Sequence, residues 1–136
     1  MSLESDLRTA LESRLATLPG LPAVAWENVE YTEREGVPYL EPRLLPAEDV
    51  FSPTSATGAT VAAGIYQVII SVPTGRGRAE YAELLDALRA HFPRALTLDH
   101  GDARVVVHKV WAGAGYRRGA FMRVPVSVRY RAITKD

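Results

Sequence analysis

The segment 122–130 reads Met-Arg-Val-Pro-Val-Ser-Val-Arg-Tyr, and it decides the fold class. Apolar and polar side chains alternate along it with the two-residue period of a β-strand, so one row faces a core and the other faces water. The apolar row is Met122, Val124, Val126, Val128 and Tyr130, and the polar row is Arg123, Pro125, Ser127, Arg129 and Arg131. A strand buried on one side predicts a sheet that packs against a second layer on one face.

Four further segments have the composition of strands. They are residues 24–29, 39–45, 64–72 and 104–111. Residues 64–72 are rich in β-branched and aromatic side chains, which predicts a central strand. Residues 39–45 include Pro42. Because proline cannot donate a hydrogen bond to a neighbouring strand, we expect this segment at a sheet edge or at a bulge.

Two segments instead repeat their apolar residues with the 3.6-residue period of a helix. Residues 3–18 place five leucines on one stripe, Ser2 is the expected N-cap, and Pro19 ends the pattern. Residues 78–92 carry the second stripe, and Pro93 terminates it. Both segments begin with acidic side chains, which the positive end of a helix dipole favours. The sequence therefore predicts two amphipathic helices.

Two connections are longer, or richer in small residues, than ordinary turns. Residues 46–63 exceed the length of most loops, which predicts a functional or mobile segment. Residues 112–120 form a glycine-rich link that carries Arg117 and Arg118. The predicted class is α+β, a mixed and largely antiparallel sheet of four to six strands with two helices packed on one face. The order is helix, strand, strand, long loop, strand, helix, strand, strand, in a single domain over residues 1–136.

Composition excludes several classes of protein. The chain of 136 residues is 47% hydrophobic and 24% charged, which is ordinary for a folded domain. It has no cysteine, so disulfides, thiolate nucleophiles and cysteine-type zinc or iron–sulfur sites are excluded. Residues 50–75 carry no charge, but their prolines, serines and threonines argue against a transmembrane helix. Glu4 and Asp6 stand where a signal peptide requires positive charge, so we expect no cleaved leader.

The reactive side chains show no catalytic or metal-binding arrangement. His91, His100 and His108 match no zinc spacing. Residues 74–78, Thr-Gly-Arg-Gly-Arg, lie between a strand and a helix but lack the Gly-Lys-Ser/Thr ending of a phosphate loop. The acidic turn at 99–102 lacks the further oxygen ligands of a calcium loop. We therefore expect no enzymatic activity, no metal and no cofactor.

Seven arginines in the second half of the chain raise the alternative of a nucleic-acid-binding or regulatory module. They are Arg76, Arg78, Arg117, Arg118, Arg123, Arg129 and Arg131. On exposed strands and loops, such side chains pair with phosphates. The expected strands, however, lack the paired aromatic residues of an RNA-recognition sheet, and the chain is neutral overall. A solvated or protein-facing basic surface is therefore favoured.

Five segments, taken in order, resemble the small tail-terminator family of long-tailed phages and prophages. They are residues 22–29, 39–43, 64–75, 88–93 and 124–130. The resemblance implies an α+β subunit without catalytic residues that assembles into a ring, hexameric in the family. Such a ring caps the growing tail tube, stops its polymerisation and presents the surface on which the head-side connector docks. The fold also resembles other tail-tube and connector components, so a neighbouring assembly role stays open.

The resemblance also implies partners and a location. The expected partners are further copies of the chain, the tail-tube protein and the head–tail connector, with no membrane and no nucleic acid. The expected location is the host cytoplasm during assembly and then the virion tail. A ring of identical subunits joins two different patches of each subunit. The candidate interface residues are Phe51, the large anchor of the loop 46–63, and Arg76, Arg78, Arg117 and Arg118.

The formal net charge of zero hides a division along the chain. Residues 1–60 hold ten acidic and four basic side chains, whereas residues 61–136 hold six acidic and twelve basic ones. If the two halves form different faces, copies of the chain attract each other head to tail. We therefore predict a separation of charge in space and, as the first partner, another copy of the chain.

Overall fold

The computed structural model describes residues 3–46, 50–51 and 60–134. They form two helices and eight strands. In chain order these are α1 (Leu3–Ala16), β1 (Ala23–Val24), β2 (Tyr39–Pro46), β3 (Val50–Phe51), β4 (Thr60–Pro73), α2 (Ala79–His91), β5 (Thr97–His100), β6 (Ala103–Ala112), β7 (Tyr116–Arg118) and β8 (Phe121–Thr134).

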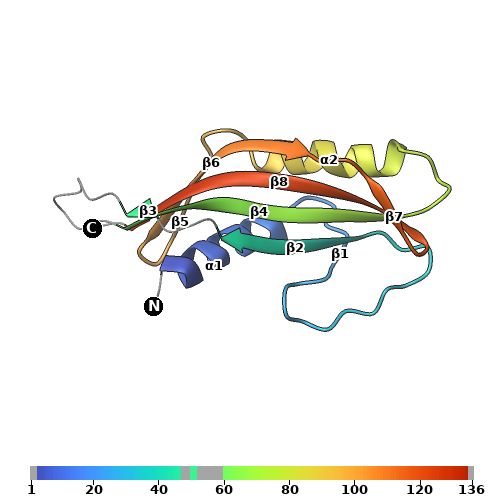
Figure 1. Cartoon of the computed structure of the whole chain (residues 1–136), viewed down its shortest axis with the longest axis horizontal. Coiled ribbons are helices and arrows are strands. Elements are labelled where there is room, and N and C mark those ends of the chain that lie inside the picture. The colour runs from blue at the N-terminus through green and yellow to red at the C-terminus, as the bar shows by residue number, and fades with distance from the viewer. Residues whose placement is uncertain (1–2, 47–49, 52–59, 135–136) are drawn as a thin grey trace.

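All of these strands belong to one curved sheet (Figure 1). Its main path runs β1-β2-β4-β8-β6-β5, while β3 pairs with β4 and β7 pairs with β8. Among the described strands, β1 and β2 are parallel and all other pairs are antiparallel. The long strands β4 and β8 pair along most of their length, from Val61 opposite Ile133 to Pro73 opposite Phe121. The predicted α+β class and mixed, largely antiparallel sheet are confirmed.

The hydrophobic core lies on one face of β4 and β8. Their even-numbered side chains are buried there, as the alternation in segment 122–130 predicts. The same cluster contains apolar side chains from both helices. Its largest members include Tyr66, Val68, Ile70 and Val72 of β4, Val124, Val126, Val128 and Tyr130 of β8, Leu7, Leu11 and Leu15 of α1, Leu88 of α2, and Phe92. The odd-numbered residues of β2, β4 and β8 lie on the opposite side, which we call the open face.

Polar contacts fix α1 against its neighbours. His91 Nε2 lies 2.6 Å from the carbonyl oxygen of Arg14, and Arg14 Nε donates to the carbonyl oxygen of His91 at 2.9 Å. These two contacts join α1 to the end of α2. On another side, Arg8 forms an ion pair with Glu27, which follows β1. The connection between β1 and β2 is therefore tied to the first helix.

The first predicted strand in chain order is much shorter than expected. β1 spans Ala23–Val24 rather than residues 24–29. The chain turns just after it, because the Val29 N–H donates to the Trp26 carbonyl oxygen at 3.0 Å and Asn28 adopts a φ of 62°. Apolar residues in this stretch thus line a connection and do not continue the sheet.

The other differences from the prediction come from three short strands, β3, β5 and β7, and from the early start of β4. The expected loop 46–63 is shorter than predicted, because residues 50–51 pair with residues 60–61 and β4 begins at Thr60. β5 and β7 form hairpins with β6 and β8, and neither has enough residues to show a period in the sequence. The sheet therefore contains more strands than the predicted four to six.

β2 lies beside the sheet edge, as Pro42 predicts. β1 covers only its first two residues, Tyr39 and Leu40. The Ala25 N–H donates to the Leu40 carbonyl oxygen at 2.7 Å, so the even-numbered residues of β2 direct their backbone groups away from β4. Pro42 and Pro46 occupy such positions, where the missing N–H breaks no bond to β4. The uncovered part of this edge therefore offers few donors to a further strand.

Candidate functional site

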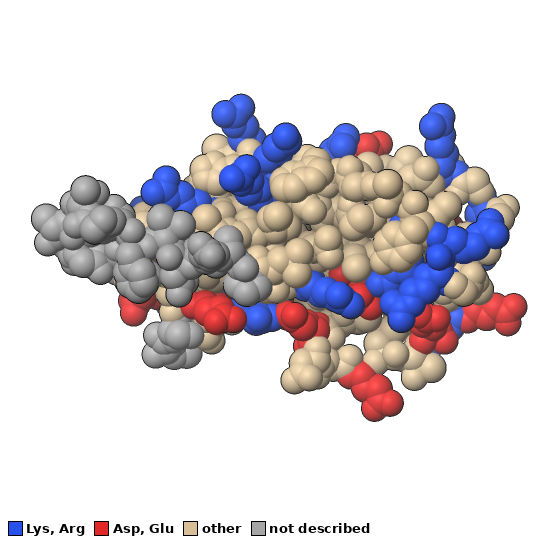
Figure 2. Space-filling model, viewed as in Figure 1, with Lys and Arg blue, Asp and Glu red and all other residues tan. Residues whose placement is uncertain are grey.

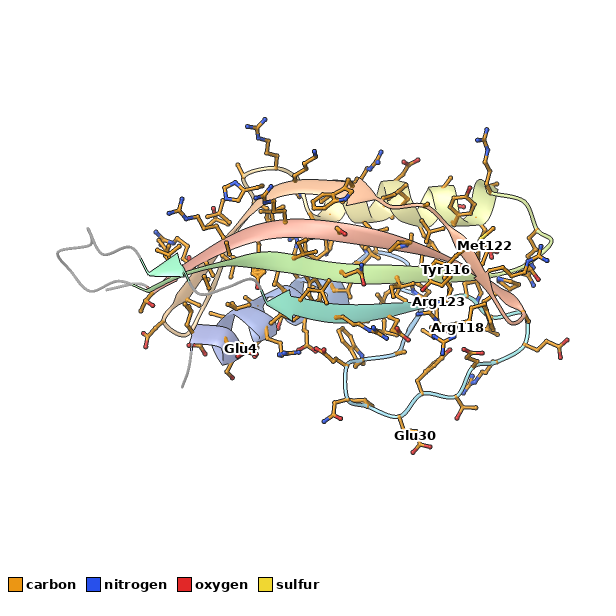
Figure 3. The ribbon with its side chains drawn as sticks, viewed as in Figure 1. Glu4, Glu30, Tyr116, Arg118, Met122 and Arg123 are labelled. Atoms are coloured by element: carbon orange, nitrogen blue, oxygen red, sulfur yellow. The ribbon has the colours of Figure 1, made fainter. Side chains whose placement is uncertain are left out.

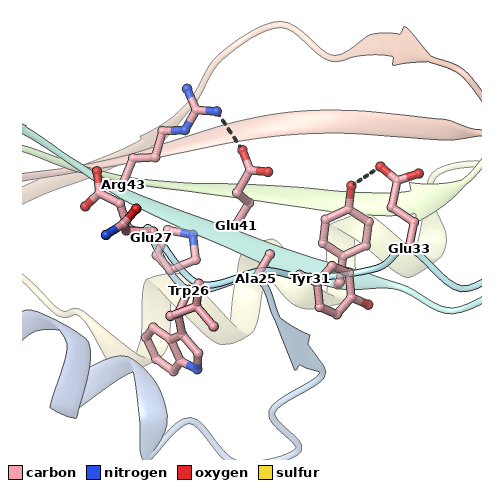
Figure 4. Close-up of a pocket in the computed structure, with 11 residues that line it drawn as sticks. Ala25, Trp26, Glu27, Tyr31, Glu33, Glu41 and Arg43 are labelled. Atoms are coloured by element: carbon pink, nitrogen blue, oxygen red, sulfur yellow. Dashed lines mark hydrogen bonds and ion pairs between the residues drawn. The ribbon is translucent and has the colours of Figure 1, made fainter.

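A groove of about 370 Å³ follows the edge of β2 (Figure 4). Its lining includes three aromatic rings and three carboxylates, from Trp26, Tyr31, Tyr39, Glu27, Glu33 and Glu41. Tyr39 Oη donates to Glu33 Oε1 at 2.9 Å, and the rings of Tyr31 and Tyr39 lie 4.9 Å apart. Burial raises the pKa of Tyr39, so its hydroxyl stays protonated. Aromatic rings beside carboxylates suit a cationic side chain.

One buried arginine ties this groove to the centre of the sheet. Arg123 of β8 is 2% exposed and donates to Tyr39 Oη at 3.0 Å, to Glu41 Oε2 at 2.8 Å and to Tyr116 Oη at 3.3 Å (Figure 3). Glu41 also pairs with Arg43 at 3.0 Å. Burial by itself lowers the pKa of Arg123, but the Tyr116 hydrogen bond and the charge of Glu41 raise it overall. Arg123 is therefore a permanent internal cation.

This position corrects the sequence interpretation of Arg123. The alternation in segment 122–130 places it on the polar row, and we grouped it with exposed arginines that face phosphates. Its partners come from β2 and β7, and Glu41 lies 82 positions away in the chain. No local pattern in the sequence contains that information. Arg123 is unavailable to a nucleic acid.

The connection after β1 carries unbalanced negative charge. We call residues 27–35 the acidic loop, which contains four glutamates and one arginine. Glu27 is paired with Arg8, but Glu30 and Glu35 are exposed and form no ion pair with any residue that the structure describes. Figure 3 shows Glu30 pointing away from the sheet. Beside it, Val29 is 61% exposed. The loop thus presents carboxylates around an apolar side chain.

The four arginines predicted for an interface gather near the start of α2 and the β7 hairpin. Arg78 and Arg117 line one pocket of about 410 Å³. Arg118 follows on β7 and is exposed (Figure 3). Arg76 is already engaged, since it donates to the Gly36 carbonyl oxygen at 3.1 Å. We call Arg78, Arg117 and Arg118 the hairpin cluster. The backbone of Phe51, the fifth candidate, belongs to β3, and its side chain lies outside the described part of the structure.

A second group of cations lies on the open face. Lys109 of β6 stands directly opposite Arg129 of β8, and Arg131 follows two residues further along β8. All three are exposed, and none has an ion pair within the described residues. We call them the basic strip. Like charges directly opposite each other on neighbouring strands repel, so the strip destabilises the isolated subunit.

The two basic groups are far apart. Arg118 is paired with Phe121 at the start of β8, whereas Arg131 lies ten residues further along the same strand. At about 3.3 Å per residue, this separates the two ends by roughly 33 Å. The seven arginines grouped in the sequence therefore form no continuous basic face. Three make up the hairpin cluster and two belong to the basic strip, while Arg123 is buried and Arg76 donates to Gly36.

Within residues 3–46, 50–51 and 60–134, no group of three or more histidine and carboxylate side chains is arranged to hold a metal ion. No helix in the described part of the chain is both long and apolar enough to cross a membrane.

Most of the chain matches a known family. Residues 6–130 fit the sequence model of a family described as phage tail terminator protein. The chain belongs to this family. The resemblance seen in the sequence is thereby confirmed, and the chain is a phage tail structural protein. A comparison with curated protein sequences finds no match.

Solved structures share this fold, and eight chains match it. One, described without a function, is 30% identical, with a TM-score of 0.76 and coverage of 97% of this chain and 96% of the other. A second, from a structure described as the virion of a native gene transfer agent particle, is 17% identical. Its TM-score is 0.66, with coverage of 97% of this chain and 98% of the other. At that identity, the second likeness shows the fold alone.

Proposed function

We propose that this tail terminator assembles into a ring that caps the tail tube, ends its polymerisation and presents the surface to which the head-side connector binds. The family match over residues 6–130 is the observation that carries the proposal. A ring of six copies is what the resemblance implies. Assembly would take place in the host cytoplasm, after which the ring becomes part of the virion tail.

A cap of this kind needs two sorts of contact, lateral ones between copies and axial ones to the tube and the connector. The hairpin cluster supports an axial role, because it lies where β8 begins and β4 ends, away from the long edges of the sheet. Exposed arginines at such an end can pair with carboxylates of another protein. We assign Arg78, Arg117 and Arg118 to axial contact, with Phe51 and Arg76 as further candidates in the same assembly.

The test is a tube-growth assay with the tail-tube protein encoded beside this gene. Electron microscopy measures tube lengths with and without the tail terminator. We expect shorter tubes with a ring at one end. Arg117→Glu with Arg118→Glu should weaken capping, whereas the matched pair Arg89→Glu with Arg94→Glu should not. Unchanged tube lengths, with no ring at any end, would contradict the proposal.

The basic strip favours one alternative, a nucleic-acid-binding module. Such a module would be a monomer whose affinity for DNA falls steeply as salt rises. Closed rings without DNA affinity support the tail terminator function instead. Microscopy of concentrated protein together with a salt titration of DNA binding separates the two.

A further inference from the structure

We propose that the acidic loop of one copy binds the basic strip of the next copy, and that this contact closes the ring. The inference rests on the proposed function, since it names the two surfaces that join neighbouring copies. The order of the sheet supplies the geometry. The acidic loop lies beyond β2, whereas the basic strip lies on β8 and β6, with β4 between them. Figure 1 shows the connection between β1 and β2 on the far side of the sheet from β6.

Charge complementarity favours a second copy as the occupant. The acidic loop has a net charge of −3 and the basic strip has three positive charges. Figure 2 shows Asp and Glu mainly along the lower side of the molecule, where some Lys and Arg lie among them, and further Lys and Arg along the upper side and at one end. Two acidic sides repel each other, as do two basic sides, so copies associate head to tail. Such a contact repeats from copy to copy and forms a ring where the rotation closes.

The two surfaces also match in their apolar parts. A pocket of about 220 Å³ lies on the basic strip, lined by Val61, Ala63, His108, Tyr130, Arg129 and Arg131. On the acidic loop, Val29 is 61% exposed and stands beside Glu30. Protein interfaces combine an apolar centre with a charged rim. The structure assigns Val29 of one copy to this pocket of the next copy. The carboxylates beside Val29 then face Arg129 and Arg131 of that next copy.

The edge of β2 determines how the contact is made. Its outward positions include Pro42 and Pro46, which have no N–H to donate, so a neighbouring strand cannot extend the sheet there with a regular ladder. The contact is therefore made by side chains, and unlike a backbone ladder it weakens as salt screens the charges. A phosphate backbone would satisfy the three cations, but it offers no apolar group for the pocket. For this reason a protein occupant fits better than a nucleic acid.

The test uses two charge-reversed forms of the full chain. Variant X carries Glu30→Arg and Glu35→Arg in the acidic loop, and variant Y carries Arg129→Glu and Arg131→Glu in the basic strip. Native mass spectrometry and electron microscopy measure the fraction of chains in rings at low salt. Like-charge contacts cost several kcal/mol, so each variant alone should lose more than about tenfold in ring-forming affinity. An equal mixture should recover rings in which X and Y alternate.

Several controls keep the outcome decisive. Arg89→Glu with Arg94→Glu changes the charge as much as variant Y and should leave the rings intact. Val29→Asp should abolish rings, while Val29→Ile should keep them. Urea unfolding of each variant shows whether the subunit is still folded.

The possible failures are distinguishable. If the wild type forms rings and folded X and Y form them equally well, the inference is wrong and the proposed function stands. If the mixture of X and Y fails to recover rings, the pairing of these two surfaces is wrong. If the wild type neither forms rings nor caps tubes, the proposed function itself fails. Loss of DNA binding in variant Y with unchanged rings would assign the strip to nucleic acid.

Discussion

Removing the negative charge of Glu41 should destabilise the subunit more than removing the positive charge of Arg123. In Glu41→Gln, Arg123 remains charged and 2% exposed, and the groups that can accept its hydrogen bonds, two tyrosine hydroxyls and the new amide oxygen, carry no charge. In Arg123→Met, by contrast, Glu41 keeps Arg43 at 3.0 Å and is itself 22% exposed. The asymmetry arises because only the first variant leaves a buried charge without a counter-charge.

The magnitudes follow from these exposures. Breaking a buried ion pair from one side costs roughly 3–5 kcal/mol, and the partial exposure of Glu41 places Glu41→Gln near the lower end, at about 3 kcal/mol. For Arg123→Met we expect about 1–2 kcal/mol, since the Tyr39 hydroxyl still donates to Glu33 and the apolar replacement needs no partner. Urea unfolding gives both free energies by linear extrapolation.

Arg43 provides the control for this pair. Its side chain is 50% exposed, so Arg43→Met alone should cost less than about 1 kcal/mol. The double variant Arg43→Met with Arg123→Met should cost more than the sum of the two single changes, because Glu41 then has neither cation. A larger loss for Arg123→Met than for Glu41→Gln would refute the reasoning.

Three further predictions concern buried groups. Tyr66→Phe should raise the free energy of unfolding by up to about 1 kcal/mol, because the buried Tyr66 hydroxyl has no hydrogen-bond partner among the described residues; a loss in urea unfolding would contradict this. Gly101→Ala should cost about 1–3 kcal/mol in thermal unfolding, because Gly101 has a φ of 55° and the new Cβ would lie 2.7 Å from Asp6 Oδ2. The control is Gly119→Ala. Gly119 has a similar φ of 59°, but a Cβ added there would meet no described atom within 4 Å, so this variant should lose less stability. Burial raises the pKa of Tyr130 to about 12 from 10, so the folded chain keeps a proton that the unfolded chain releases. The contribution of Tyr130 to stability should be fully present below pH 10 and should be lost between pH 10 and 12. Over that range, the urea midpoint of Tyr130→Phe should therefore fall less steeply than that of the wild type.

Regular periodicity made the long elements predictable. Both helices and the parity of β8 follow from the spacing of apolar residues, because burial on one face imposes a period of 3.6 or 2. The predicted strand 24–29 was too long because the chain turns at Asn28. β5 was not predicted because it has only four residues, too few to show a period. Short strands depend on what they pair with, and that information lies elsewhere in the chain.

The alternation of odd and even positions was less informative about polar side chains. It places Arg123 and Arg129 on the same row, yet Arg123 is 2% exposed and Arg129 is open to solvent. The difference comes from the ends of the strand: the start of β8 is flanked by β7 and by the Tyr39–Glu41 part of β2, which supply three acceptors. Asp6 is a similar case. The helix dipole explains why an acidic residue stands at the start of α1, but it does not predict that Asp6 is buried against the β5–β6 turn.

The division of charge along the chain acquires its meaning from the order of the strands. The acidic first half supplies β1, β2 and the connection between them, and the basic second half supplies β8 and β6. Between these groups lies β4, which belongs to the uncharged stretch 50–75 and pairs with β2 on one side and β8 on the other. Arg123 of β8 reaches across this strand to Glu41 of β2, and that pair is buried inside the subunit. The acidic loop and the basic strip form no ion pair with each other within the described residues, and two strand spacings, roughly 10 Å, exceed the screening length of about 8 Å at physiological salt. These two surfaces are therefore left to interact with the next copy.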